Sequence, residues 1–419
     1  MMREDLAKGE QDLRTTLVTC LIIFLFESFH GNFPLAVAQI RTGTELIYEW
    51  RRTLPSASPA HYPSPDPTTV EDELVQAFGG FSIQTFSEPD PRPPSRCDTL
   101  KQGAEEVIRQ MPATFPTLKI ARAYLELIMR SATVFLSVTG AQMYSEITNH
   151  TSLNLSPMEE EQSMARLSSL QAGQQRQFED TEDLAHQRSA LSDTAIPQIA
   201  DEDYISQNFQ KQSSFVRQMD DLQREENLAK LRQWHQAFRS MPAKVQMKGS
   251  PGWLLLQLHY KTSIFALRSL SLDLMAYDNF YDLMLEIVTL SSRILEDFNR
   301  LGIPFFAPDL AIILPLYLVG MKCRFSSLRS RIIKLLLGQC RREGIWDSIL
   351  VGKIVEWVKD VEETYMEGEG DKKRIPGWAR VEPVHTSFDL LERRATVVCF
   401  QRTGPDDPLP RKIESTLLW

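Results

Sequence analysis

Residues 302–348 read GIPFFAPDLAIILPLYLVGMKCRFSSLRSRIIKLLLGQCRREGIWDS, and this stretch carries the clearest structural signal in the chain. Its apolar residues recur at three- and four-residue intervals, which is typical of amphipathic helices. The predicted helices cover Asp309–Met321, Leu328–Leu337 and Trp346–Tyr365. Pro315 falls inside the first helix, so a kink or break is expected there. Asp347 or Ser348 is expected to cap the third helix.

The same period extends through most of the chain. Further helices are predicted over residues 12–30, 34–52, Val70–Ser87, Thr99–Gln110, Leu118–Ile147, Phe215–Met241, Trp253–Tyr277 and Asn279–Leu301. Gly31-Asn32 suits a left-handed cap after the first helix, and Gly79-Gly80 is expected to end the third. Strand-forming residues over 379–402 predict a β-hairpin. The predicted fold is all-α, an irregular and loosely solenoid-like array of helical hairpins with a short C-terminal β-hairpin.

Changes in composition divide the chain into four segments. Residues 1–148 and 213–378 are predicted to be the N-terminal and C-terminal helical parts of one regulatory domain. Residues 149–212 are rich in Gln, Ser, Glu and Asp, which predicts a polar insertion that is flexible or poorly packed. Residues 379–419 form the predicted hairpin and tail. The proline-rich stretch Pro55–Pro67 is expected to be an extended connector.

The bulk composition is that of a soluble globular protein, with 42% hydrophobic and 24% charged residues among 419. The net charge of −9 argues against binding of nucleic acid by this chain alone. The five cysteines are widely spaced and have no metal-ligand spacing, so neither a disulfide framework nor a metal site is predicted. Cys20, Cys323 and Cys340 are expected to be small buried residues in a reducing compartment.

The segment Leu17–Phe26, LVTCLIIFLF, is the one place that suggests a membrane. A spanning helix needs about 20 apolar residues, and this run is shorter. Acidic residues precede it and no cleavage pattern follows, so a signal sequence is not predicted. We expect a buried helix and no membrane contact.

No catalytic motif is present, and the titratable residues do not form a pattern. His259 is a lone helical histidine, and His61 lies in a proline-rich connector. Asp278 and Asp282 are one helical turn apart, without a third ligand, which suggests a helix-start charge effect. The protein is therefore predicted not to be an enzyme, with no catalytic, cofactor-binding or metal-binding residues.

The segment Lys322–Arg342 contains seven basic residues. A phosphate or DNA could bind there, but the pattern favours the solvated face of an amphipathic helix. Trp346 is expected to pack against Arg341 and Arg342. A small-molecule sensor remains an alternative, with a pocket lined by residues such as Trp253, Phe265 and Phe306.

Four motifs together resemble the fungal-specific regulatory region of zinc binuclear cluster transcription factors. They are CLIIFLFESFHGN (20–32), PFFAPDLAIILPLYLVGMKCR (304–324), RREGIWDS (341–348) and ARVEPVHTSFDLLERRATVVCF (379–400). The resemblance implies a nuclear, helical regulatory domain downstream of a six-cysteine zinc module that reads DNA. Many members of the family control metabolic or secondary-metabolite genes.

Residues 1–16 contain no cysteine, so zinc is expected only if an upstream module exists. We therefore expect a transcription-regulator-like protein that acts through contacts with a DNA-bound factor or with itself. The resemblance implies the nucleus as its location, with the cytoplasm as the alternative. A cytosolic helical scaffold is the other alternative function.

Overall fold

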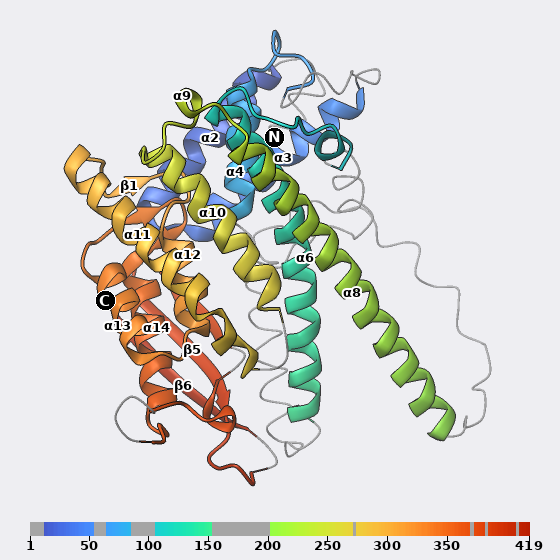
Figure 1. Ribbon diagram of the computed structural model, residues 1–419, viewed down its shortest axis with the longest axis vertical. Coiled ribbons are helices and arrows are strands. Elements are labelled where there is room, and N and C mark those ends of the chain that lie inside the picture. Colours follow the sequence, from blue (N-terminus) through green and yellow to red (C-terminus); the bar gives the residue numbers. More distant parts are fainter. Residues whose placement is uncertain are drawn as a thin grey trace, which may run out of the picture. The chain divides into compact units, whose positions relative to one another are not determined.

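The computed structural model describes residues 12–53, 64–84, 105–152, 202–270, 274–368, 373–381, 384–407 and 410–419. These residues are predominantly helical and end in a small antiparallel sheet, as predicted (Figure 1). The arrangement as a loosely solenoid-like array of hairpins stays a prediction. The chain divides into two compact units, one formed by residues 1–138 and 223–419 and the other by residues 139–222.

The elements of the first unit are mostly short helices. Its helices are α2 (Leu13–His30), α3 (Phe33–Thr53), α4 (Asp72–Ser82), α9 (Ala243–Gln246), α10 (Pro251–Arg268), η2 (Ala276–Phe280), α11 (Tyr281–Leu301), α12 (Ile313–Lys322), α13 (Ser326–Leu337), α14 (Ser348–Glu363) and η4 (Gly377–Ala379). Its strands are β1 (Phe306–Ala307), β2 (Arg342–Glu343), β3 (Trp346–Asp347), β4 (Val384–Asp389), β5 (Arg394–Gln401) and β6 (Arg411–Leu418). Two long helices, α6 (Leu118–Ser152) and α8 (Glu202–Arg239), run through both units.

The hairpin of α2 and α3 forms where the sequence predicts it. Gly31 has a φ of 87°, in the left-handed region that glycine adopts without strain. Its N–H donates to the Glu27 carbonyl and closes α2. Because Gly31 lacks a side chain, Leu390 packs closely against it. The turn therefore also positions the β4–β5 connection beside the C-terminal end of α2.

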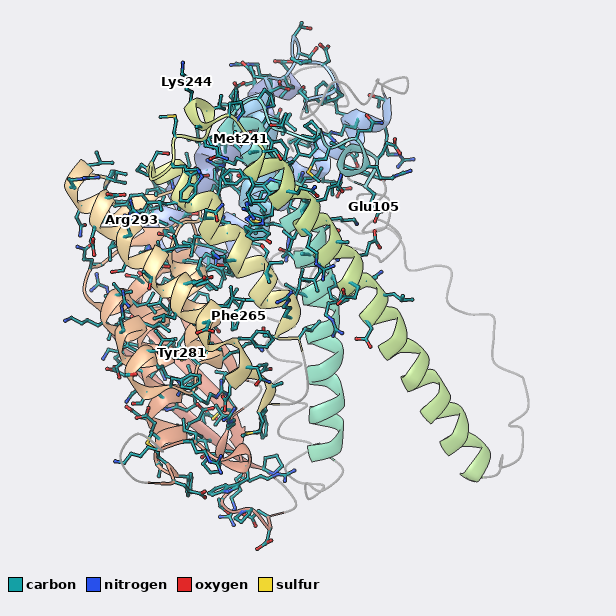
Figure 2. All side chains as sticks on the ribbon, in the orientation of Figure 1. Glu105, Met241, Lys244, Phe265, Tyr281 and Arg293 are labelled. Carbon is teal, nitrogen blue, oxygen red and sulfur yellow. The ribbon has the colours of Figure 1, made fainter. Side chains whose placement is uncertain are left out.

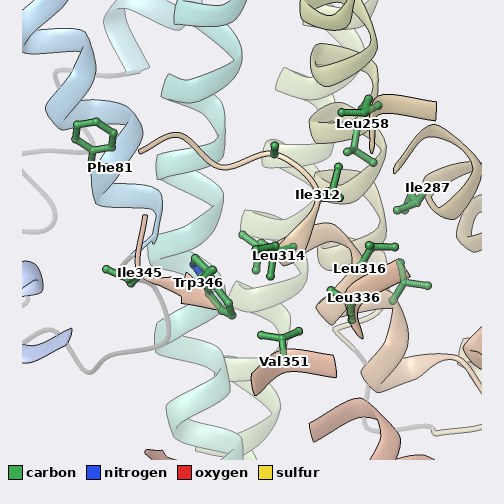
Figure 3. Packing of buried hydrophobic residues seen from close by; sticks show 14 of the residues in the cluster. Phe81, Leu258, Ile287, Ile312, Leu314, Leu316, Leu336, Ile345, Trp346 and Val351 are labelled. Carbon is green, nitrogen blue, oxygen red and sulfur yellow. The ribbon is translucent and has the colours of Figure 1, made fainter. Parts of the chain in front are cut away.

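The main core of the first unit lies among α2 to α4 and α10 to α14. Figure 3 shows Leu258, Ile287 and Leu316 packed in this cluster, with Ile345 and Trp346 at one side of it. A second cluster surrounds the buried indole of Trp234, whose Nε1 donates to the Ala121 carbonyl at 2.8 Å. Figure 2 labels Phe265, a fully buried α10 residue of the main cluster.

Two helix boundaries differ from the prediction because of tertiary contacts. The helix predicted over Trp253–Tyr277 ends at Arg268, and the Nζ of Lys322 then donates to the Ser269 carbonyl at 3.3 Å. The helix α4 does not end at Gly79-Gly80 but continues to Ser82. A Cβ on either glycine would meet side chains of α6, so these residues allow close helix packing instead of a stop.

The predicted kink at Pro315 is wrong, because α12 begins at Ile313 and not at Asp309. Proline is tolerated in the first turn, where its missing N–H has no partner inside the helix. The third predicted helix begins at Ser348, since Trp346 and Asp347 form β3. This strand belongs to a three-stranded sheet of β1, β2 and β3 that sequence analysis did not predict.

The predicted C-terminal hairpin is confirmed as β4 and β5, which pair antiparallel from Val384–Cys399 to Asp389–Arg394. A third strand, β6, was not predicted and pairs with β5 over its full length. Ala395 and Val397 of β5 are buried, and they pack in a cluster with Leu350 of α14. The sheet therefore closes on the helical body through its inner face.

The predicted polar insertion 149–212 falls mostly outside the described residues. Its last part is helical, since α8 begins at Glu202 and not at the predicted Phe215. The boundaries of the four predicted segments stay predictions.

Candidate interaction surface

The segment 341–348 is the motif with the highest proportion of charged residues among those behind the resemblance, and it is buried except for the half-buried Arg342. The Glu343 carboxylate accepts hydrogen bonds from the backbone N–H groups of Ala311, Ile312 and Ile313 at 2.9, 3.2 and 3.0 Å. These are donors at the start of α12, where a negative charge is favoured by the helix dipole. The Nε of Arg341 donates to the same carboxylate at 2.9 Å and balances its charge.

Arg342 and Asp347 join two helices through the same segment. The Nη1 of Arg342 donates to the carbonyls of Ser28 and Phe29 at 3.2 and 2.7 Å, at the C-terminal end of α2. Its Nη2 donates to Asp347 at 3.1 Å. Asp347 in turn accepts from the N–H groups of residues 349 and 350 and caps α14, as predicted.

Gly344 completes this junction. Its φ of 55° lies in the left-handed region, and a Cβ there would lie 1.8 Å from the Oε1 of Gln84. That oxygen accepts from the Ile345 N–H at 3.2 Å, while the Nε2 of Gln84 donates to the Pro308 carbonyl at 2.6 Å. Segment 341–348 thus connects the ends of α2 and α4 with the starts of α12 and α14.

The predicted packing of Trp346 against Arg341 and Arg342 stays a prediction. The Trp346 ring lies against Tyr317, with ring centroids 5.6 Å apart, inside the main core (Figure 3). Arg341 lies over the ring of Phe298 at 4.4 Å. The guanidinium groups of both arginines are used in ion pairs, and the indole packs on apolar and aromatic neighbours.

The basic segment Lys322–Arg342 is only partly the solvated face that the sequence suggests. Arg324 and Arg329 are buried and share Glu362, which is also buried, through N–O distances of 2.7 and 2.6 Å. Arg329 also donates to the Cys323 carbonyl, and Glu362 accepts from the Val381 N–H. These cations are therefore unavailable to a phosphate, whereas Arg331 and Lys334 are exposed on α13 as predicted.

Asp278 and Asp282 also have different surroundings. Asp278 forms a two-pronged ion pair with the buried Arg380, with N–O distances of 3.0 and 2.6 Å. Arg380 also donates to the Leu274 carbonyl at 2.6 Å. Asp282 is exposed in the first turn of α11, where the predicted helix-start effect applies. Asp278 therefore holds η2 against the residue that directly follows η4.

His259 lies half-buried on α10, next to a small group of charged residues. Burial is the first cause and the nearby charge of Arg122 the second that lower the pKa of its imidazole to about 4. Arg122 itself pairs with Glu126 at 2.6 Å and with Asp309 at 3.1 Å. The Nε2 of His259 is buried and has no hydrogen-bond partner among the described residues. His259 is thus neutral near pH 7. His61 lies outside the described residues.

The three residues proposed to line an effector pocket do not converge. Trp253 and Phe265 both lie on α10, separated by about 18 Å along the helix axis at 1.5 Å per residue. Phe306 is in β1, and its ring contacts Phe29 with a centroid distance of 5.5 Å. These three residues therefore do not form the effector pocket that the small-molecule-sensor hypothesis proposed.

The cysteines are partly as predicted. Cys20 and Cys323 are buried, but Cys340 is exposed because it follows the end of α13. Cys399 is buried in β5, and Cys97 lies outside the described residues. Among the residues that the structure describes, no three His, Cys, Asp or Glu side chains are placed to hold a metal ion.

An exposed apolar surface is the feature that sequence analysis missed. It consists of Ile22, Phe26 and Phe29 on α2 together with Phe305, and we call these four residues the α2 surface. Their exposed fractions are 60%, 57%, 49% and 59%. The rings of Phe29 and Phe305 lie 6.3 Å apart, so the surface continues from α2 to the segment before β1.

The prediction that Leu17–Phe26 is buried is thus only half right. Leu17, Cys20 and Phe24 point into the core, but the opposite side of α2 is exposed. The signal in the sequence was a helix that is apolar on every side, which needs cover on more than one side. In the described part of the chain, α2 is also long and apolar enough to cross a membrane, although a core helix passes the same test.

A scan against protein-family models finds no match, and neither curated proteins nor solved structures match the chain.

Proposed function

We propose that this protein is a transcription-regulator-like protein that works by protein–protein contact, and that the α2 surface makes this contact. The observation that carries the proposal is the group of four large apolar side chains, each about half exposed, on one surface. Contiguous exposed apolar residues of this kind mark sites of interaction. The resemblance to the regulatory region of zinc-cluster transcription factors supplies the biological setting, the nucleus.

The charged motifs support contact over catalysis or direct DNA reading. Arg324, Arg329 and Arg341 are neutralised by buried carboxylates. A DNA-binding surface needs exposed cations that can replace the counterions of phosphates. The net charge of −9 works against such binding as well. The protein therefore acts on promoters through a partner, and the genes it controls are expected to be metabolic or secondary-metabolite genes.

A tethered reporter assay tests this proposal. The full chain is fused to a heterologous DNA-binding module in a fungal reporter strain, and its location is followed with a fluorescent tag. We expect a nuclear protein that changes reporter output. The double variant Phe26→Asp/Phe29→Asp is expected to lose this effect, because two charges make the surface unfit for apolar contact.

The control variant is Met247→Asp, since Met247 is 61% exposed and lies on the loop between α9 and α10. It should keep full reporter activity. A chain excluded from the nucleus that leaves the reporter unchanged would overturn the proposal and favour a cytosolic scaffold. Equal reporter activity of the wild type and the Phe26→Asp/Phe29→Asp variant would show that the α2 surface does not make the functional contact.

A further inference from the structure

We propose that the partner of the α2 surface is a second copy of this chain, bound with its α2 antiparallel about a two-fold axis through Ile22. This inference rests on the proposed function, because it names the occupant of the same surface. It also specifies a symmetric dimer, a property that the proposed function does not require.

The outward side of α2 has the spacing of a helix–helix seam. Thr15, Thr19, Ile22, Phe26 and Phe29 follow one another at intervals of four, three, four and three residues, and all five are exposed or half-exposed. This is the heptad spacing that brings side chains against a neighbouring helix. The stripe spans 14 residue steps, or about 21 Å. Its length and period thus fit another helix as partner.

The stripe is complementary to itself in one orientation only. Ile22 lies at its midpoint, with two threonines towards the N-terminus and two phenylalanines towards the C-terminus. An antiparallel copy centred on Ile22 places Phe29 of each helix level with Thr15 of the other, and Phe26 within one residue of the level of Thr19. Large side chains then meet small ones, which is how close-packed layers interdigitate. A parallel copy would instead crowd the phenylalanines together and leave a gap between the threonines.

The Asp12 carboxylate and the His30 ring, at opposite ends of α2, favour the same orientation. Asp12 is exposed just before the helix, and His30 is exposed as its last residue. The antiparallel arrangement brings the Asp12 carboxylate of each copy near the His30 ring of the other, whereas a parallel arrangement would set like groups together. Phe305, which lies against Phe29, extends the contact beyond each end of the stripe.

The size of the surface sets the expected strength of the dimer. Stable interfaces bury about 800 Å² on each partner, and one helix stripe with a flanking ring lies at the low end of that range. We therefore expect a reversible dimer with a dissociation constant on the order of tens of micromolar.

The first experiment measures the mass of the full chain by light scattering at concentrations from about 5 to about 200 µM, which bracket the expected dissociation constant. The wild type and the Met247→Asp control should pass from monomer to dimer over this range. The Phe26→Asp/Phe29→Asp variant should stay monomeric with an unchanged circular dichroism spectrum. A dimer that persists in that variant would overturn the proposal.

Disulfide trapping then tests the orientation, in a parent chain with Cys97→Ser and Cys340→Ser. Ile22→Cys chains should cross-link to themselves, because Ile22 lies on the axis. Phe29→Cys chains should not, since the two copies of residue 29 lie on opposite sides of that axis. An equal mixture of Thr15→Cys and Phe29→Cys chains should form a mixed dimer. Self-cross-linking of Phe29→Cys would show a parallel pair and overturn the antiparallel model.

The reporter assay keeps the two proposals distinguishable. A strictly monomeric chain whose reporter activity still depends on Phe26 and Phe29 would overturn the dimer and preserve the proposed function. A monomer that sediments with phosphatidylcholine and phosphatidylserine vesicles would make the α2 surface a membrane contact, which overturns both.

Discussion

In both segment 341–348 and the outward side of α2, the degree of burial is the opposite of what the composition suggests. The first has two arginines, a glutamate and an aspartate, and is buried or half-buried throughout. The second is apolar and exposed. Burial of the charges is possible because each one has an oppositely charged partner and further hydrogen bonds. Exposure of the phenylalanines has no such compensation within the described chain, which is why we assign them to a partner.

The largest expected effect comes from the most deeply buried ion pairs. Glu362→Gln removes the charge that Arg324 and Arg329 share, although it keeps the shape of the side chain. Two buried cations would then lack a counter-charge, and breaking such a network typically costs about 3–5 kcal/mol. Urea unfolding followed by circular dichroism would measure the loss of unfolding free energy.

A matched surface variant calibrates this result. Glu356 pairs with Lys353 at 2.9 Å on the same helix, and both side chains are 39% exposed. Glu356→Gln should therefore lose only about 0.2–1 kcal/mol. The triple variant Arg324→Met/Arg329→Met/Glu362→Met should be more stable than Glu362→Gln, because no charge is left buried alone. Equal losses for Glu362→Gln and Glu356→Gln would contradict the burial of this network.

A smaller effect is expected inside segment 341–348 itself. Glu343→Gln keeps one oxygen that can accept from the α12 backbone, but it removes the charge that Arg341 balances. Hydrogen bonds to a charged group contribute roughly 1.5–3 kcal/mol, so a loss of about 2 kcal/mol is expected. Hydrogen exchange of the amides of residues 311 to 313 would locate the loss at the start of α12. Unchanged protection of those amides would argue against the capping role.

The positions of most helices and of the β4–β5 hairpin could be predicted from the sequence because they follow local rules. The 3.6-residue period located α2, α3, α11 and α13, and Gly31 marked the turn between α2 and α3. The interaction partners of the charged side chains could not be predicted from the sequence. Nothing in the sequence around Glu343 indicates that its hydrogen-bond donors are backbone amides some 30 residues earlier. Nor does the sequence indicate that Gln84 accepts a hydrogen bond from the Ile345 N–H. Long-range pairing, and not local propensity, turns these polar residues into core residues.

The strand β6 and the α2 surface escaped prediction for a related reason. In β6 the exposed Lys412, Glu414 and Thr416 alternate with partly buried residues. In the sequence these polar residues at every second position resemble a polar tail. In α2 the apolar residues surround the helix, so no periodicity separates the buried side from the exposed one. The exposed side becomes visible only when the partners of the buried side are known.

His259 provides a third kind of buried polar group, one that avoids burying a charge by staying neutral. Its folded-state pKa of about 4 lies below the unfolded value of about 6.5. The unfolded chain therefore binds more protons between these values, and stability is complete above about pH 6.5 and falls as the pH drops towards 4. One such group changes the unfolding free energy by about 1.4 kcal/mol per pH unit in this window. Urea unfolding between pH 7 and pH 5 would measure this slope.

The variant His259→Gln should flatten that slope, because glutamine does not titrate. Below about pH 4 the imidazole binds its proton in both the folded and the unfolded chain, so the curves of the wild type and the variant should become parallel there. Identical slopes for the two chains throughout would mean that the imidazole is accessible to water and charged in the folded state.

The smallest expected effect on stability is at the α2 surface. Phe26 and Phe29 are about half exposed, and the ring contacts of the two side chains are with His30, Phe305 and Phe306. Exposed substitutions away from core contacts usually change stability by less than about 0.5 kcal/mol. The Phe26→Asp/Phe29→Asp variant should therefore unfold at nearly the wild-type urea concentration when both are measured below about 1 µM, where the dimer has dissociated. At higher concentrations the wild type alone should gain stability, since a partner that binds only the folded chain raises its unfolding free energy. A large loss at low concentration would instead place both rings in the core of the monomer.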